Sequence, residues 1–155
     1  MYKPKSLRTA LTEAVPLLQT NPEKLTLSVE SGNVASTLAA SLSFENQYTL
    51  KLTIADFVDD LSTIFVPIQA WLRIHQADMM ATQPGRKHGF TYSAALNDNG
   101  SAELTISLQL TERTLVSEVE GELRAEYAPE PQPAEPVTRP MQLYVHGELV
   151  SEWYE

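Results

Sequence analysis

A proline-rich stretch near the carboxyl end divides this chain into two unequal parts. Prolines recur every few residues from Pro129 to Pro140. Because proline lacks a backbone N–H, the stretch predicts an extended spacer rather than a helix or a central strand. About a dozen residues at ~3.1 Å each would span roughly 35 to 40 Å. We therefore expect a body at 1–128, an extended linker at 129–140 and a terminal segment at 141–155. The alternative is a loop that folds back on its own domain.

The terminal segment alternates apolar and polar side chains around a turn at His146 and Gly147. This alternation predicts a β segment. Aromatic and aliphatic side chains that lie beyond a linker are suited to anchoring in a partner's pocket. We therefore predict an interface with an adjacent subunit, formed by Leu143, Val145, Leu149, Val150 and Trp153.

The composition is that of an ordinary globular protein. The chain has 155 residues, 43% of them hydrophobic, which suits one domain with appendages. It contains no cysteine, which excludes disulfides, thiolate zinc sites and cysteine nucleophiles. No apolar run approaches the ~18 to 20 residues that span a bilayer, and residues 1–6 lack the apolar segment of a signal peptide. We expect a soluble protein made in the cytoplasm, with no membrane partner.

The formal net charge of −9 is concentrated in the last third of the chain. Residues 1–100 contain 9 acidic and 8 basic side chains, whereas residues 101–155 contain 11 and 3. A surface built from this third repels a phosphate backbone, so we expect no specific nucleic-acid binding. The repulsion does not prevent DNA from passing nearby. The alternative interpretation is a solvated surface that keeps the protein soluble.

Two segments have helical spacing of apolar residues. The first is residues 6–19, for which Ser6 is the expected N-cap and Pro16 the expected bend. Asp59 or Asp60 is expected to cap the second, whose apolar stripe runs from Leu61 to Leu72 and contains a further proline. A short helical piece is expected after Asn21.

Strand patterns occupy most of the remaining body. Residues 25–30 and 46–55 alternate, and Ser31-Gly32-Asn33 is expected to end the first of these strands. Asn99-Gly100 predicts a hairpin between strands at 90–97 and 103–111, with more strand up to Tyr127. An exposed basic loop is expected at 83–89.

These elements predict an α+β fold: two main helices pack on one face of a four- or five-stranded, mainly antiparallel sheet, followed by the proline-rich arm and the terminal β segment. The predicted core comprises Leu11, Phe65, Ile68, Trp71, Leu72, Ile106 and Leu108.

No motif indicates catalysis. The histidines at 75, 88 and 146 are far apart in sequence and have no partner at metal-ligand spacing. Asp56, Asp59 and Asp60 form a tight carboxylate cluster, which helix capping explains better than a cation site. We therefore predict no catalytic, cofactor-binding or metal-binding residues and no cofactor. The competing enzyme hypothesis is a small hydrolase that uses Asp56 with His75 or His88.

Five stretches carry a family resemblance by their order and spacing: Leu7–Pro16, Ser41–Leu50, Val66–Arg73, Leu110–Thr114 and Leu143–Val150. Together with the Pro-Glu-Pro arm and the Glu-Leu-Val-Ser-Glu-Trp end, they resemble the tail-completion protein R family of temperate contractile-tailed phages and related prophages. The resemblance spans almost the whole chain, although no single stretch is specific. It implies a structural protein of the virion tail, assembled in the cytoplasm of the host bacterium.

The resemblance further implies a protein that caps the head-proximal end of the tail tube, stops its polymerisation and prepares it for head joining. The implied partners are the tail tube protein, head-tail connector proteins and copies of the same chain. A ring is expected, a hexamer by analogy with similar tail terminators. If the acidic third lines the lumen, DNA can slide through it. The alternative is a transient tail-assembly chaperone that is absent from the finished virion.

Overall fold

The computed structural model describes residues 1–131 and 140–154. The first predicted helix is two helices: α1 (Lys3–Ala14) and α2 (Pro16–Thr20), followed by a short 3-10 turn, η1 (Pro22–Lys24). Val15 between them is extended (φ −101°, ψ 116°). A residue before proline disfavours the helical region, and Pro16 is well placed in the first turn of a new helix. The expected bend at Pro16 is therefore a break, and the helical piece after Asn21 is confirmed.

The prediction that Ser6 caps the first helix is wrong. The helix begins three residues earlier, and the Ser6 hydroxyl accepts a hydrogen bond from Trp71 Nε1 at 3.0 Å. The N–H groups of Tyr2 and Lys3 donate instead to the Glu112 carboxylate, at 2.5 and 3.1 Å. A residue distant in sequence therefore supplies the acceptor that a helix start requires.

The second long helix, α3 (Ser62–His75), runs through Pro67. The Asp60 carboxylate accepts the Ser62 N–H at 2.8 Å, as expected for one of the two candidate caps. Beyond it lie a 3-10 turn, η2 (Ala77–Met80), and a short helix, α4 (Gln83–His88). The expected loop at 83–89 is therefore mainly a helix, although its basic side chains are exposed as predicted. The Thr82 hydroxyl accepts the Gly85 N–H at 3.1 Å and begins this helix in the manner of an N-cap.

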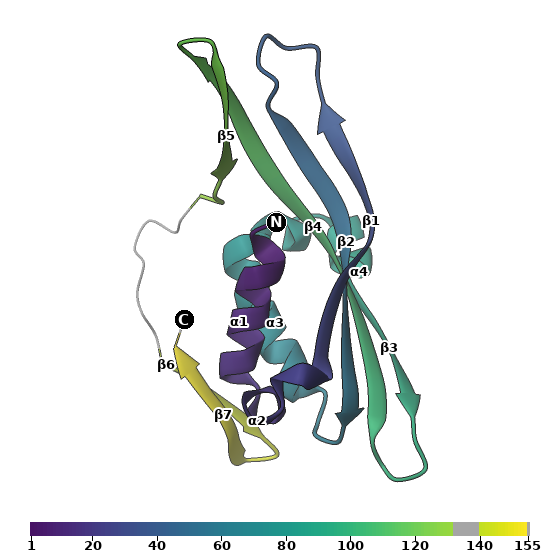
Figure 1. The fold of residues 1–155 in the computed structure, drawn as a ribbon. Coiled ribbons are helices and arrows are strands. Elements are labelled where there is room, and N and C mark those ends of the chain that lie inside the picture. Colours follow the sequence, from purple (N-terminus) through teal and green to yellow (C-terminus); the bar gives the residue numbers. More distant parts are fainter. Residues whose placement is uncertain (132–139, 155) are drawn as a thin grey trace.

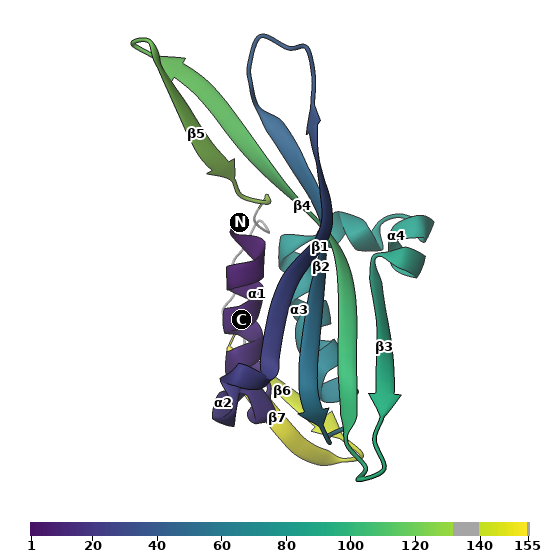
Figure 2. The same cartoon turned by 45° about the vertical axis from the view of Figure 1, so that its right-hand side comes forward.

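The sheet is antiparallel and has the order β1-β2-β4-β3, with β5 paired to the far end of β4. Its strands are β1 (Leu25–Ser36), β2 (Phe44–Phe57), β3 (Phe90–Leu96), β4 (Ala102–Val119) and β5 (Glu122–Ala128). The predicted hairpin at Asn99-Gly100 is confirmed, with Gly100 at φ 83°. Figures 1 and 2 show that the strands twist into one long, curled sheet.

The predicted end of the first strand at Ser31–Asn33 is wrong. After a bulge between Val29 and Ser31, β1 continues along β2 to Ser36. Gly32 lies opposite Tyr48, where an added Cβ would be 3.2 Å from the Tyr48 Cβ. The glycine therefore permits the close approach of the tyrosine and does not end the strand.

The core lies between one face of the sheet and the helices α1 and α3 (Figure 1). Six of the predicted core residues are buried: Leu11, Ile68, Trp71, Leu72, Ile106 and Leu108. Phe65 is only half-buried and packs edge-on against Phe90 with ring centroids 5.5 Å apart. The predicted α+β class is confirmed, including two long helices on one face of the sheet.

The terminal segment forms a separate hairpin of β6 (Pro140–Val145) and β7 (Glu148–Tyr154). His146 and Gly147 both have positive φ, 52° and 83°, as a two-residue hairpin turn requires. The predicted turn is therefore confirmed. The predicted linker at 129–140 falls largely on 132–139, outside the described residues.

Candidate interaction surfaces

The C-terminal hairpin lies against the chain's own helices (Figure 1). The Ser151 hydroxyl donates a hydrogen bond to the carbonyl of Ala14 at the end of α1. At the hairpin turn, His146 Nε2 lies 3.6 Å from Asp60 Oδ2, beside the start of α3. The hairpin thus pairs the backbone carbonyl of Ala14 at the end of α1. The C-terminal hairpin therefore packs on the helices of its own chain.

The predicted interface residues differ in exposure. Leu143 is buried, Val145, Val150 and Trp153 are half-buried, and Leu149 is 49% exposed. Trp153 lines a groove between α1 and α3 whose wall also includes Trp71. The structure contains a single chain, so contact between this cluster and an adjacent subunit stays a prediction.

A buried carboxylate joins β4 to the start of α1. Glu112 is only 6% exposed, and besides the two N–H groups of α1 it accepts the Tyr48 hydroxyl at 2.8 Å. Its position continues the inward-facing series Leu104, Ile106, Leu108 and Leu110. The sequence signal for this junction is a charged residue in phase with a buried apolar series, and the sequence-based predictions did not include it.

The fully buried ammonium group of Lys3 extends the junction. It donates to Gln76 Oε1 at 2.7 Å and to Glu130 Oε1 at 2.9 Å. Gln76 in turn accepts the Thr111 N–H at 3.0 Å and donates to the Thr111 hydroxyl and to Asp78. The junction therefore ties α1, η2, β4 and the chain after β5 together with satisfied polar groups.

Burial shifts the pKa of three groups near this junction. Burial raises the pKa of Tyr48 far above its usual range, and the hydrogen bond to Glu112 and its charge raise it further. Burial, with the charges of Glu112 and Glu130, raises the pKa of Tyr127 to about 12. Burial lowers the pKa of His75, and the nearby charge of Lys3 adds to that effect. Each shift favours the neutral form of its group.

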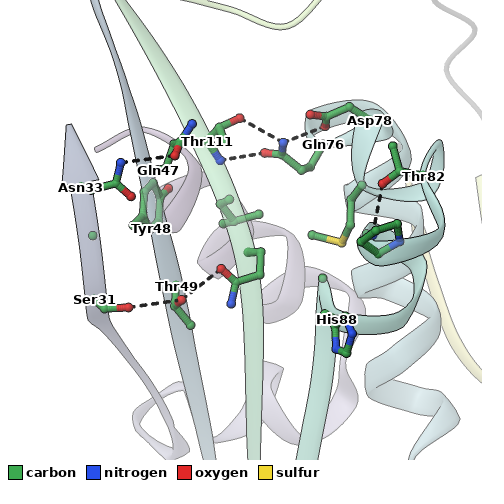
Figure 3. A pocket seen from close by; sticks show the side chains of 17 residues that line it. Ser31, Asn33, Gln47, Tyr48, Thr49, Gln76, Asp78, Thr82, His88 and Thr111 are labelled. Atoms are coloured by element: carbon green, nitrogen blue, oxygen red, sulfur yellow. Dashed lines mark hydrogen bonds between the residues drawn. The ribbon is translucent and has the colours of Figure 1, made fainter. Parts of the chain in front are cut away.

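A groove of about 580 Å³ lies between β1, β2, β4 and the segment η2–α4. Figure 3 shows the hydroxyl and amide side chains of Ser31, Asn33, Gln47 and Thr49 on one side of it and His88 on the other. Its titratable lining residues are Tyr48, Asp78 and His88. Met79, Pro84 and Leu110 also line it, so the groove suits a chain segment with both polar and apolar side chains.

The pairing that the enzyme hypothesis requires is not present in either groove. His88 lines the groove of Figure 3 and His75 lines the groove between α1 and α3, but Asp56 lines neither. Asp56 lies in a β-bulge at φ 51°, and its N–H donates to Glu103 Oε1 at 3.3 Å. Within residues 1–131 and 140–154, no group of three or more histidine and acidic side chains is arranged to hold a metal ion.

The far half of the sheet extends beyond the helices and is exposed on both faces (Figures 1 and 2). The 14 residues of α3 span about 21 Å at ~1.5 Å per residue. The 18 residues of β4 span about 60 Å at ~3.3 Å per residue. The helices are therefore too short to cover the sheet. We call the uncovered part, residues 31–47 and 113–128, the distal sheet.

No helix among the described residues is both long and apolar enough to cross a membrane.

Comparison with known proteins relates the chain to a family and to a curated relative. Residues 1–131 match the family model described as P2 phage tail completion protein R (GpR). Over all 155 residues the chain is 56% identical to the tail completion protein R of Escherichia phage P2, covering the full length of both chains. No solved structure matches. The family match thus spans the body, and the relative also matches the C-terminal hairpin.

Proposed function

The chain belongs to the P2 phage tail completion protein R family, and from this premise we propose that it caps the head-proximal end of the tail tube as a closed ring. The family is one of structural tail-completion proteins and not of enzymes, which makes this chain a tail-associated assembly protein. Stopping the growth of the tube and preparing it for head joining are the finer parts of the proposal.

The physical reason for a ring is the open edge of the tube. A tube of stacked subunits presents an edge that keeps adding further subunits, whereas closed cyclic symmetry leaves no unpaired edge. The capping protein contacts the tube protein with one face and offers a different face to the head-tail connector proteins. A hexamer is proposed by analogy with tail terminators.

The observation that carries the proposal is the distal sheet. It projects from a well-packed body, exposes both faces, and holds apolar side chains such as Val34 and Leu123, which are 63% and 64% exposed. Exposed apolar side chains on a projecting sheet are typical of a protein that completes its packing in an assembly. An acidic lumen wall would let packaged DNA pass without binding it.

Purified tails provide the test. We expect mass spectrometry to find the protein in finished tails at a fixed ratio to the tube protein, and cryo-electron microscopy to place it at the head-proximal end. The transient chaperone, the second candidate, predicts its loss from tails after purification. Absence from intact tails, with presence in the assembly lysate, would refute the cap and favour the chaperone.

A further inference from the structure

The β4–β5 hairpin within the distal sheet carries an unbalanced negative charge. It contains four glutamates, Glu118, Glu120, Glu122 and Glu126, against Arg113 and Arg124. The ion pair found on it is a long one, Arg124 to Glu122 at 3.9 Å, between side chains that are both exposed. The exposed tip of the hairpin is therefore an acidic surface.

The shape of this tip is well defined. Glu120 and Gly121 have φ values of 55° and 82°, the geometry of a two-residue turn that matches the twist of paired strands. Side chains from the neighbouring β1–β2 loop also hold β4: the Ser43 hydroxyl accepts the Val116 N–H at 2.9 Å, and Ser41 donates to the Val116 carbonyl at 3.0 Å. The hairpin is thus presented as an ordered element.

The helix α4 carries the opposite charge. Arg86, Lys87 and His88 are all exposed, and within the described part of the chain no carboxylate lies within 4 Å of the Arg86 or Lys87 nitrogens. The helix is packed closely on η2. A Cβ at Gly85 would lie 2.2 Å from the Met79 carbonyl oxygen, and one at Gly89 would lie 2.4 Å from Met79 Cγ. Because glycine has no Cβ, α4 can pack this closely against η2.

The polar groove of Figure 3 runs beside α4. Asn33, Gln47 and Thr49 offer amide and hydroxyl groups on one side, and His88 lies on the other. Gln109 also lines the groove. Asn33 Nδ2 donates to Gln47 Oε1 and the Thr49 hydroxyl donates to Gln109 Oε1, so these groups bind a partner by exchanging exposed hydrogen bonds.

Figure 2 shows β5 and α4 on opposite sides of the molecule. Two complementary surfaces on opposite sides of one subunit produce a heterologous, head-to-tail contact, which closes into a ring when the rotation permits. We propose that the acidic tip of the β4–β5 hairpin of one subunit docks in the groove beside α4 of a second copy. This inference rests on the proposed ring and names the surfaces that form it.

Arg86 and Lys87 do not line the groove, whose lining includes the acidic Asp78, so the attraction between the tip and α4 acts beside the groove. This attraction guides the approach and fixes the register of the subunits. The apolar side chains of the distal sheet, including Leu123 and the half-buried Val116, supply area that becomes desolvated in the contact. The charge pairs thus give specificity, and the apolar side chains give the contact its stability.

A charge exchange tests the proposal. The tip variant carries Glu118→Lys and Glu122→Lys, and the helix variant carries Arg86→Glu and Lys87→Glu. The exchange variant carries all four changes, and its tip and α4 have exchanged charges. A control with Glu23→Lys, in η1, and Asp98→Lys, in the β3–β4 turn, changes the charge by the same amount as the tip variant at exposed positions outside the hairpin tip and α4. Circular dichroism melting checks that every variant folds like the wild type.

Each variant replaces the wild-type gene in the phage or prophage that encodes the chain, and completed tails and infectious particles are counted. We expect the tip variant and the helix variant each to reduce the yield about tenfold or more, because like charges then face each other. The exchange variant should restore most of that yield, and the control should match the wild type.

Two outcomes overturn the inference. One is a wild-type yield from the tip or helix variant alone. The other is an exchange variant that folds but stays as defective as its two parents, since a partner other than a second copy would not carry the compensating change. If the wild-type protein is found in tails in the same experiment, the proposed cap stands while the inference fails. If it is missing from tails, both fail.

Discussion

At the scale of single residues, Glu112 has the largest expected effect on stability. Replacing it with alanine leaves the N–H groups of Tyr2 and Lys3 and the Tyr48 hydroxyl without their acceptor in a buried site. We expect Glu112→Ala to lower the free energy of unfolding by about 3 kcal/mol. Urea denaturation followed by circular dichroism measures the change.

Two further variants serve as references for Glu112→Ala. Glu112→Gln keeps a side-chain oxygen that accepts from the start of α1, so it should lower the free energy of unfolding by less than Glu112→Ala does. Glu118→Ala, on the exposed hairpin of the same strand, should stay within about 0.5 kcal/mol of the wild type. Equal effects of the alanine changes at 112 and 118 would show that the junction does not stabilise the fold.

The raised pKa of Tyr48 predicts loss of stability in alkali. Its pKa is higher in the folded protein than in the unfolded chain, so above pH ~10 the unfolded chain binds fewer protons and is favoured. The contribution is fully present below pH ~10 and declines as the pH rises beyond it. Denaturation at pH 8, 10 and 11 should show a steeper decline for the wild type than for Tyr48→Phe. Parallel profiles would contradict the role of Tyr48.

At the scale of elements, α3 depends on Trp71. Its side chain is 5% exposed, stacks on His75 with ring centroids 4.6 Å apart and donates to Ser6 of α1. Trp71→Ala should lower the free energy of unfolding by about 3 to 5 kcal/mol. Phe65 is half-buried, so Phe65→Ala should lower the free energy of unfolding by less than Trp71→Ala does. Thermal melting compares the two variants, and unchanged melting of Trp71→Ala would be inconsistent with the observed packing of α1 on α3.

The C-terminal hairpin gives a second prediction for an element. A chain ending at Pro131 lacks β6 and β7, yet it keeps the sheet, both long helices and Glu130, the partner of the buried Lys3. We expect this truncated chain to fold with a moderately lower melting temperature and to fail to form the ring, because it lacks the cluster around Trp153. Light scattering and incorporation into tails measure the two effects. A truncated chain that assembles normally would show that the hairpin packs only on its own chain and forms no contact between subunits.

For the whole molecule, the prediction concerns the length of the tail tube. If the ring closes the open edge of the tube, removing the protein leaves that edge able to add subunits. Lysates without the protein should contain tubes of excess or irregular length that are not joined to heads, as seen by electron microscopy. Supplying the wild-type chain from a plasmid should restore uniform, joined tails. Tubes of normal length in the absence of the protein would show that it does not control tube length, whatever its part in head joining.

Local patterns in the sequence determined most of the elements. Alternation around Asn99 and Gly100 predicted the β3–β4 hairpin, and the helical spacing around Trp71 predicted α3, because these periodicities reflect which face of an element is buried. The resemblance between five stretches and the tail-completion protein R family also agrees with the comparisons. The tail-completion role was therefore predicted from the ordered set of motifs, and no catalytic group contributed to that prediction.

Contacts between distant residues decided the rest. Ser6 lies inside α1 because Glu112, on β4, accepts the N–H groups at the start of that helix. Pairing with β2 carries β1 past Gly32, where local rules predict an end. The mismatch in length between α3 and β4 leaves the distal sheet uncovered and places its acidic tip on the opposite side of the molecule from α4. Such relations depend on which segments meet in space, and a pattern read along one segment does not contain them.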